Sequence, residues 1–297
     1  MQNVYASSQT RDSVHALGSH ADSIDVLRRV SGMRKHPFEH VLIEQALPPE
    51  RYERLSATFP SLDVLSRGRG DYGSNQAVRM ATRNVLGNPA ISPEWQEFFE
   101  YHTSARFWQS LVAVFGDSIR RLHPNLEARI GKPLEAWIVK RRGESGAADI
   151  ALDCLFVANT PVTRPSSVKP PHIDRSDKLF TGLFYCRDPR DETLGGDLEL
   201  HEFVGRPLFD KHQVPPGRSR LAATVSYRPN SFVGFVNAVE AVHGVSPRPV
   251  TSAVRRYVDF VCELPFRLID PPQMGFARRM IYRAFQRPRS RAYNPEE

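Results

Sequence analysis

The chain has 297 residues, of which 40% are hydrophobic and 25% are charged, so it carries enough apolar material for a sizeable globular core. Its net charge of +7 is compatible with an anionic partner, and the absence of a run of about eighteen apolar residues excludes a conventional membrane span. The three cysteines are widely spaced within apolar runs, which argues against a disulfide framework or a zinc cluster and predicts a reducing, cytoplasmic environment.

The N-terminal part of the chain predicts an arm followed by a strand and a helix. Residues 1–35 are mostly polar, lack the apolar core of a signal peptide, and predict a flexible arm with one short helix over 22–30. We expect a strand over 36–43. A helix is expected over 48–59, because proline is tolerated in a first helical turn.

The next segment predicts a loop and then helices. Residues 67–93 are rich in Gly, Asn, Arg and Ser without an apolar period, which predicts a long loop. Apolar residues recur with a helical period over 93–121, with a break expected near His102. We therefore expect residues 36–133 to form a helical cap.

From residue 134 onward, short β-rich runs alternate with turn residues. The expected strands cover residues 134–141, 150–158, 179–187, 197–202, 221–227, 232–236 and 253–264. Short strands at this spacing are typical of a sandwich or jelly roll. The predicted fold is thus α+β but mainly β, a cupin-like jelly roll (double-stranded β-helix) over residues 134–266 with an N-terminal helical cap.

The C-terminal residues 267–297 predict a basic helix and tail. Arginines surround the apolar face of a helix expected over 274–287. This helix has two interpretations: it packs on the barrel or on a second subunit, or it rests on an anionic membrane surface. The sequence leaves both open.

Two histidines and one carboxylate form the strongest chemical signal. His172 and Asp174 lie two residues apart, and His243 follows about seventy residues later. Residues i and i+2 of an extended strand point to the same side, so His172 and Asp174 can hold one metal ion, with His243 closing the face. This ligand set leaves three adjacent coordination positions open, as in non-haem Fe(II) oxygenases.

The motifs that follow His172 strengthen this interpretation, since an isolated H-x-D is weak in a chain with 10 His and 33 acidic residues. They are KLFTGLFY at 178–185, GGDLEL at 195–200, RPNSFVGF at 228–235, HGVSP at 243–247 and RRY at 255–257. In this order they resemble the Fe(II)- and 2-oxoglutarate-dependent dioxygenases, in the branch that includes the prolyl hydroxylases. The resemblance covers about residues 134–266.

The resemblance implies a role for five residues. His172, Asp174 and His243 would bind Fe(II), with 2-oxoglutarate as co-substrate and O2 as oxidant. Arg256 would pair with the distal carboxylate of 2-oxoglutarate, a role that suits the fork of a guanidinium group. Tyr185 would donate a hydrogen bond to that carboxylate from the opposite strand, although a core tyrosine is the simpler alternative.

Arg255 competes with Arg256 for the carboxylate, and strand alternation favours Arg256. If Arg256 points inward, the residues that share its face are apolar, namely Val258, Phe260 and Cys262. If Arg255 points inward, Asp259 and Glu263 do so too, and burying these acids is costly.

The activity implied is hydroxylation of a substrate with decarboxylation of 2-oxoglutarate to succinate. Related halogenases carry a small residue at the position of Asp174, so its carboxylate argues for hydroxylation. We expect a small polar molecule or glycan as substrate, because the long cap could enclose it and basic residues precede the motif, among them Arg79, Arg164 and Lys169. A protein or peptide hydroxylase and a non-catalytic jelly-roll binding module remain as alternatives.

A nucleic-acid partner is not expected. The nucleic-acid dealkylases of this superfamily usually have a second arginine six residues after the first on the last strand, whereas Val261 and Cys262 occupy those positions here. The sequence also contains no basic and aromatic platform for stacking bases.

Overall fold

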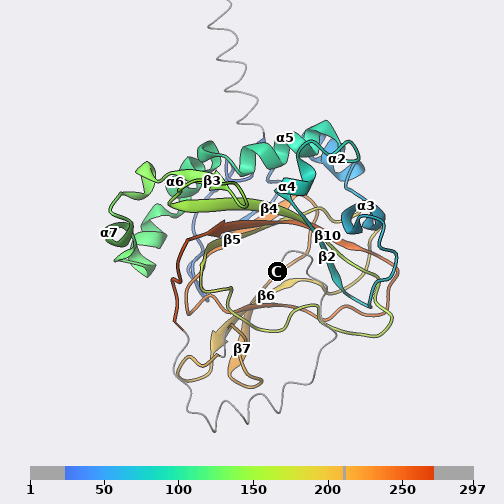
Figure 1. The fold of residues 1–297 in the computed structure, drawn as a ribbon. Coiled ribbons are helices and arrows are strands. Elements are labelled where there is room, and N and C mark those ends of the chain that lie inside the picture. The colour runs from blue at the N-terminus through green and yellow to red at the C-terminus, as the bar shows by residue number, and fades with distance from the viewer. Residues whose placement is uncertain (1–23, 210–211, 271–297) are drawn as a thin grey trace, which may run out of the picture.

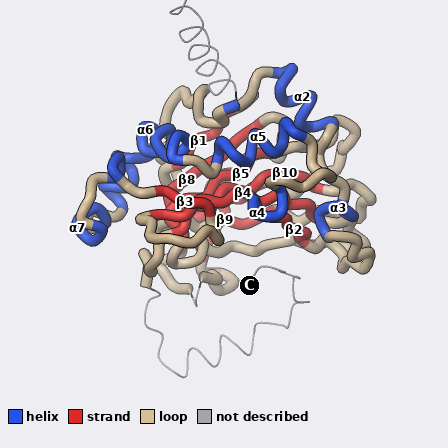
Figure 2. The backbone as a smooth tube through the Cα atoms, turned by 45° about the horizontal axis from the view of Figure 1, so that its top comes forward, coloured by secondary structure: helices blue, strands red, loops and turns tan. Residues whose placement is uncertain are grey.

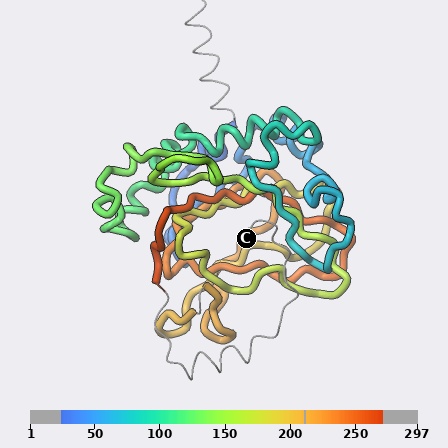
Figure 3. The backbone as a smooth tube through the Cα atoms, viewed as in Figure 1, coloured from blue at the N-terminus to red at the C-terminus, as the bar shows by residue number. Residues whose placement is uncertain are grey.

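Two β-sheets face each other and enclose the interior of the protein in this computed structural model, which describes residues 24–209 and 212–270 (Figures 1 and 3). The larger sheet has seven strands in the order β1-β8-β5-β10-β4-β2, with β3 pairing beside β4. Its strands are β1 (His40–Ile43), β2 (Ala77–Ala81), β3 (Val139–Arg141), β4 (Ile150–Asn159), β5 (Lys178–Tyr185), β8 (Ser231–Val236) and β10 (Arg255–Glu263). The smaller sheet, in the order β7-β6-β9, comprises β6 (Leu198–Phe203), β7 (Ser219–Val225) and β9 (His243–Val245). The predicted, mainly β jelly roll is confirmed.

The helices lie on the outer face of the larger sheet (Figure 2). They are α2 (Pro49–Ala57), α3 (Leu62–Ser66), α4 (Thr82–Val85), α5 (Pro93–His102), α6 (Ala105–Leu122) and α7 (Leu126–Ile130), followed by the 3-10 turn η1 (Leu134–Ala136). The predicted break near His102 is confirmed, because α5 ends there and the Ser104 side chain caps the start of α6 by accepting a hydrogen bond from the Phe107 N–H.

An aromatic layer joins these helices to the sheet. Phe98 of α5 stacks on Phe184 of β5 with ring centroids 5.6 Å apart, and Phe107 of α6 lies 5.7 Å from Phe260 of β10. All four rings are almost completely buried. The outer face of the larger sheet is therefore the main hydrophobic core, and the inner face is left for other side chains.

The region 36–133, expected to form a helical cap, contains both helices and strands. The helices within residues 36–133 pack outside the larger sheet, and the same region supplies β1 and β2 to the two edges of that sheet. The long loop expected over 67–93 contains β2 and α4. In β2 both faces are covered, so the short run Ala77–Ala81 lacks the alternation by which an isolated sequence reveals a strand.

The remaining differences are at the ends of elements. The strand expected over 134–141 begins as η1, and only Val139–Arg141 pairs with β4. Residues 26–29 form a turn where a helix was expected, and Ile24, Val26 and Leu27 are buried in the core. The predicted C-terminal helix lies outside the described residues. No helix within 24–209 and 212–270 is long and apolar enough to cross a bilayer.

Candidate metal and carboxylate site

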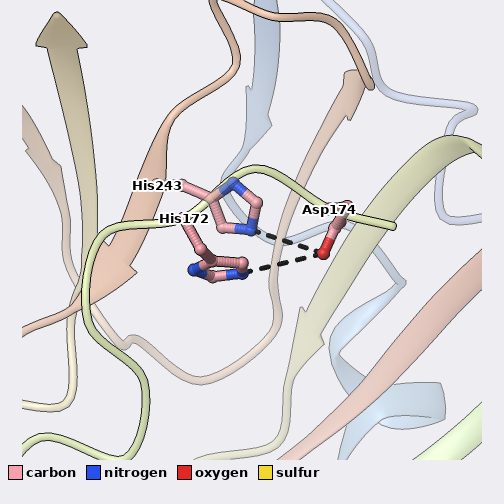
Figure 4. A group of neighbouring side chains, drawn as sticks. All are labelled: His172, Asp174 and His243. Atoms are coloured by element: carbon pink, nitrogen blue, oxygen red, sulfur yellow. Dashed lines mark ion pairs between the residues drawn. The ribbon is translucent and has the colours of Figure 1, made fainter. Parts of the chain in front are cut away.

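The predicted metal ligands meet in the interior, next to the smaller sheet (Figure 4). His172 lies in the connection between β4 and β5, where its backbone N–H and C=O both bond to His243 of β9 at 2.9 Å. This local pairing extends the smaller sheet and places Asp174, two residues further on, beside both imidazole rings. His172 and Asp174 therefore point to the same side, as their two-residue spacing in the sequence predicted.

The three side chains offer ligand atoms to one point. The Oδ1 atom of Asp174 is 3.7 Å from Nε2 of His172 and 3.9 Å from Nε2 of His243. All three residues are buried, and Nε2 of His172 has no hydrogen-bond partner among the described residues. A buried nitrogen without a partner is costly, whereas a divalent ion with N and O ligands at about 2.1 Å would satisfy it together with its neighbours.

Backbone carbonyls orient both imidazole rings. Nδ1 of His172 donates to the Pro170 carbonyl at 2.9 Å, and Nδ1 of His243 donates to the Ala241 carbonyl at 3.0 Å. With the proton on Nδ1, each Nε2 presents its lone pair toward Asp174. Such outer contacts select the tautomer and ring orientation that a metal ligand requires.

The second oxygen of Asp174 is held away from the imidazoles. The Thr181 hydroxyl on β5 donates to Oδ2, and Lys178 Nζ lies 3.3 Å from the same oxygen. Oδ1 is thus left to act as a single ligand. Thr181 is itself buried, and its polar contact orients the carboxylate.

The charge states suit a divalent cation. Burial lowers the pKa of His243 to about 4 and that of His172 well below its usual value, so both rings are neutral near pH 7. Burial alone would raise the pKa of Asp174, but the neighbouring charges, Lys178 foremost, hold it well below its usual value. Two neutral imidazoles and one carboxylate result.

Arg255, and not Arg256, points between the sheets, so the predicted orientation of the final strand is wrong. Arg255 is 1% exposed, and its guanidinium carbon lies 4.6–5.3 Å from the rings of Tyr185, Tyr227 and Tyr257. Arg256 points to the outer side, where its Nε donates to the Cys186 carbonyl at 3.0 Å.

The physical reason is that both faces of β10 are buried. Val258, Phe260 and Cys262 cover the side that packs in the main core beneath the helices, so the apolar residues point away from the interior of the barrel. Asp259 points inward at an acceptable cost, because Lys178 Nζ lies 3.6 Å from its carboxylate. The premise that the inner face must be apolar was the error.

Three hydrogen-bond donors converge around Arg255 without acceptors. Nη2 of Arg255, Oη of Tyr185 and Nδ2 of Asn159 are all buried and have no partner among the described residues. Arg255 itself is held by Nε to the Gly196 carbonyl at 2.6 Å and by Nη1 to Asn159 Oδ1 at 3.2 Å. One carboxylate could accept all three free donors.

Gly195 and Gly196 make room for this arrangement. A Cβ atom on Gly196, whose φ is +76°, would meet Cδ of Arg255 at 3.0 Å, and one on Gly195 would meet the Pro247 carbonyl oxygen at 2.0 Å. The double glycine is thus needed for close approach as well as for turning. The sequence indicated Tyr185 but not Asn159, whose place opposite Arg255 follows from the pairing of β4 with β10.

No protein-family model matches the chain, and no curated protein matches it. Among solved structures, it is similar to a prolyl-4-hydroxylase from Pseudomonas putida, with 12% identity, 83% of this chain and 99% of that chain covered, and a TM-score of 0.42. It is also similar to a prolyl 4-hydroxylase from Phytophthora capsici (12% identity, 96% and 76% covered, TM-score 0.44). A third similar structure is an oxidoreductase of the 2OG-Fe(II) oxygenase family from Burkholderia pseudomallei (16% identity, 82% and 90% covered, TM-score 0.39). At such identities and scores, any conclusion about function has to come from the residues of the site.

Proposed function

We propose that this protein is an Fe(II)- and 2-oxoglutarate-dependent dioxygenase that hydroxylates a small polar molecule or glycan. The observation that supports this most is the presence of two complementary groups in the interior between the sheets: three possible metal ligands beside the smaller sheet, and a carboxylate receptor of buried donors without acceptors on the inner face of the larger sheet. Thr181, which holds Asp174, and Tyr185 of the receptor lie on the same face of β5, with Cα atoms about 13 Å apart at 3.3 Å per residue. A separation of this size would accommodate a metal ion together with a five-carbon dicarboxylate.

The cofactors supply the oxidation when bound: 2-oxoglutarate, O2 and a substrate C–H bond give succinate, CO2 and the hydroxylated product. His172, Asp174 and His243 would hold the metal ion, and a set of three protein ligands would leave room for co-substrate and oxidant on it. The predicted role of Arg256 passes to Arg255, which with Tyr185 would bind the distal carboxylate.

The chain contributes orientation and the exclusion of water. Three tyrosine rings surround the Arg255 guanidinium, so its bond to a carboxylate would form at low effective dielectric and be correspondingly strong. Held at that end, 2-oxoglutarate would present its keto acid toward the histidines. Near the metal ligands the inner wall is charged, with Lys178 and Asp259 in contact, which suits a polar substrate better than an apolar peptide ring.

The first experiment measures metal content and turnover of 2-oxoglutarate. The wild-type protein loaded with Fe(II) should form succinate from 2-oxoglutarate under O2, slowly without substrate. His172→Ala, Asp174→Ala and His243→Ala should each lower metal content and abolish turnover. His201→Ala, a buried histidine on β6 outside the ligand set, is the matched control and should keep both.

Two outcomes would contradict the proposal. Wild-type iron content in all three ligand variants would show that the metal is held elsewhere. A protein that binds Fe(II) but never consumes 2-oxoglutarate, whatever substrate is offered, would be a binding module. Substrate class is tested separately, because hydroxylation of a peptide library with no product from metabolites and sugars would indicate a protein hydroxylase.

A further inference from the structure

Arg79 lies on the inner face of the larger sheet without an anionic partner. On β2 it is opposite Val157 of β4, which is itself opposite Tyr257 of β10, so the three residues form one inward-facing row. Arg79 is only partly exposed, and within the described residues its guanidinium group forms no hydrogen bond or ion pair. A partly buried arginine without an anion suggests that an external ligand supplies one.

Lys169 provides a second cation on the same side of the interior. Its ammonium group lies 3.8 Å from Asp174 Oδ1, the oxygen that faces both imidazoles, and 45% of its side chain is exposed. The adjacent Val168 packs against the apolar cluster of β2, β4 and β10 that flanks Arg79. Once Asp174 binds a metal ion, Lys169 no longer has a carboxylate of its own.

The other charges on this wall are already balanced. Lys178 lies 3.3 Å from Asp174 Oδ2 and 3.6 Å from Asp259, so it is paired with or without a metal ion. Arg79 and Lys169 both favour the charged form of Asp259, which is consistent with their lying in the same part of the interior. In the loaded site, the positive charges of Fe(II) and Arg255 would balance the negative charges of Asp174 and the two carboxylates of 2-oxoglutarate. The positive charges of Arg79 and Lys169 would then remain unbalanced.

An apolar strip adjoins Arg79, and Val168, the neighbour of Lys169, packs against it. The strip consists of Ala77 and Ala81 of β2, Leu155 and Val157 of β4, and Val261 of β10. A ligand with an oxyanion and a short hydrocarbon chain would match both features, since its charged end would meet Arg79 and Lys169 and its chain would cover the strip.

We propose that Arg79 and Lys169 form the recognition site for an oxyanion of the primary substrate, which is therefore a small molecule carrying a carboxylate or a phosphate group. This rests on the proposed function, since it assigns the substrate of the same metal site. The charged end would be bound beside Asp174 by Arg79 and Lys169, and the attached carbon chain would lie along the apolar strip.

The test uses the full chain loaded with Zn(II), which accepts the same ligand types without redox chemistry, and saturated with 2-oxoglutarate. Ligand-observed NMR then measures the binding of four probes with the same chain length: hexanoate, hexyl phosphate, hexanol and hexylamine. The oxyanion probes should bind more tightly than hexanol and hexylamine, and the better of the two identifies the preferred acid. Arg79→Gln and Lys169→Gln should each weaken binding of the preferred acid by about 10- to 100-fold, the usual effect of losing a hydrogen bond to a charged group.

Affinity for 2-oxoglutarate in the two variants should remain within about twofold of wild type, because Arg255 and Tyr185 bind it elsewhere. Arg83→Gln is the matched control, since Arg83 is an exposed arginine four residues along the chain beside Gly143 and should have no effect. Lys169 is half-exposed, so its variant folds even if Arg79→Gln does not, as thermal melting will show.

The proposal is overturned if hexanol or hexylamine binds as well as the acids, if no probe binds, or if both variants retain wild-type affinity. Loss of 2-oxoglutarate binding in Arg79→Gln would instead assign this site to the co-substrate. Failure of the proposed function is a separate result. In that case the wild-type Zn(II) protein would not bind 2-oxoglutarate at all, which is measured before any probe is added.

Discussion

Replacing Arg255 tests the placement of the co-substrate. Its side chain is 1% exposed, is enclosed by three tyrosine rings, and has one NH2 group without an acceptor. Arg255→Gln removes the charge and its fork of donors. Two charge-assisted hydrogen bonds at about 1.5–2 kcal/mol each amount to about 3–4 kcal/mol, so affinity for 2-oxoglutarate should fall by about 10²–10³-fold.

Isothermal titration calorimetry on the Zn(II)-loaded protein measures this loss independently of turnover. Metal affinity should change little, because Arg255 touches none of the three metal ligands in the described contacts. Arg256→Gln is the matched control. This substitution removes the same charge one residue away. The Arg256 side chain, however, lies on the outer side of β10, where it contacts the Cys186 carbonyl and Asp188.

The stability of the ligand-free protein gives a second measurement. Arg255 is a buried cation without an ion-pair partner among the described residues, so Arg255→Gln should leave the ligand-free melting temperature unchanged or higher. At a concentration of 100 times its Kd, 2-oxoglutarate should stabilise the wild type by about 2.7 kcal/mol, and this gain should nearly vanish in the variant. If Arg255→Gln retains 2-oxoglutarate affinity within fivefold, or if Arg256→Gln loses as much, the assignment of the carboxylate receptor is refuted.

Three further changes probe the surroundings of the site and the core. Thr181→Val removes the hydroxyl that orients Asp174 and should weaken Zn(II) binding by about 10- to 100-fold, with recovery in Thr181→Ser; unchanged metal affinity would show that the hydroxyl is not needed. Gly196→Ala would place a methyl group 3.0 Å from Cδ of Arg255 and should reduce 2-oxoglutarate affinity while sparing metal binding, which competition calorimetry can separate. Burial lowers the pKa of His102 to about 4, so in acid the unfolded chain binds a proton that the folded protein does not. The contribution of His102 to the free energy of unfolding should be at its maximum above pH 6.5. It should fall by about 3 kcal/mol as the pH drops to 4. Urea unfolding should show this slope in the wild type and a smaller slope in His102→Phe, and equal slopes would refute it.

The positions of most strands along the chain and the candidate metal ligands could be predicted because both depend on local periodicity. Alternation and turn residues identified most strands of the jelly roll, and the two-residue spacing of His172 and Asp174 is sufficient to put both side chains on one side of an extended segment. His243 required one further assumption, that its strand lies next to this segment. The predicted compartment, the C-terminal helix and the substrate class stay predictions.

The sequence by itself thus determined the fold class, the three candidate metal ligands and the presence of an arginine at the start of the final strand. Only the tertiary structure decided which of two adjacent arginines faces the interior. Alternation separates two faces but cannot tell which one is the core when both are buried, and here the apolar face meets the helices while the polar face lines the site. Asn159 and Arg79 acquire their proposed roles in the same way, through strand pairing between residues far apart in the chain, which no local pattern specifies.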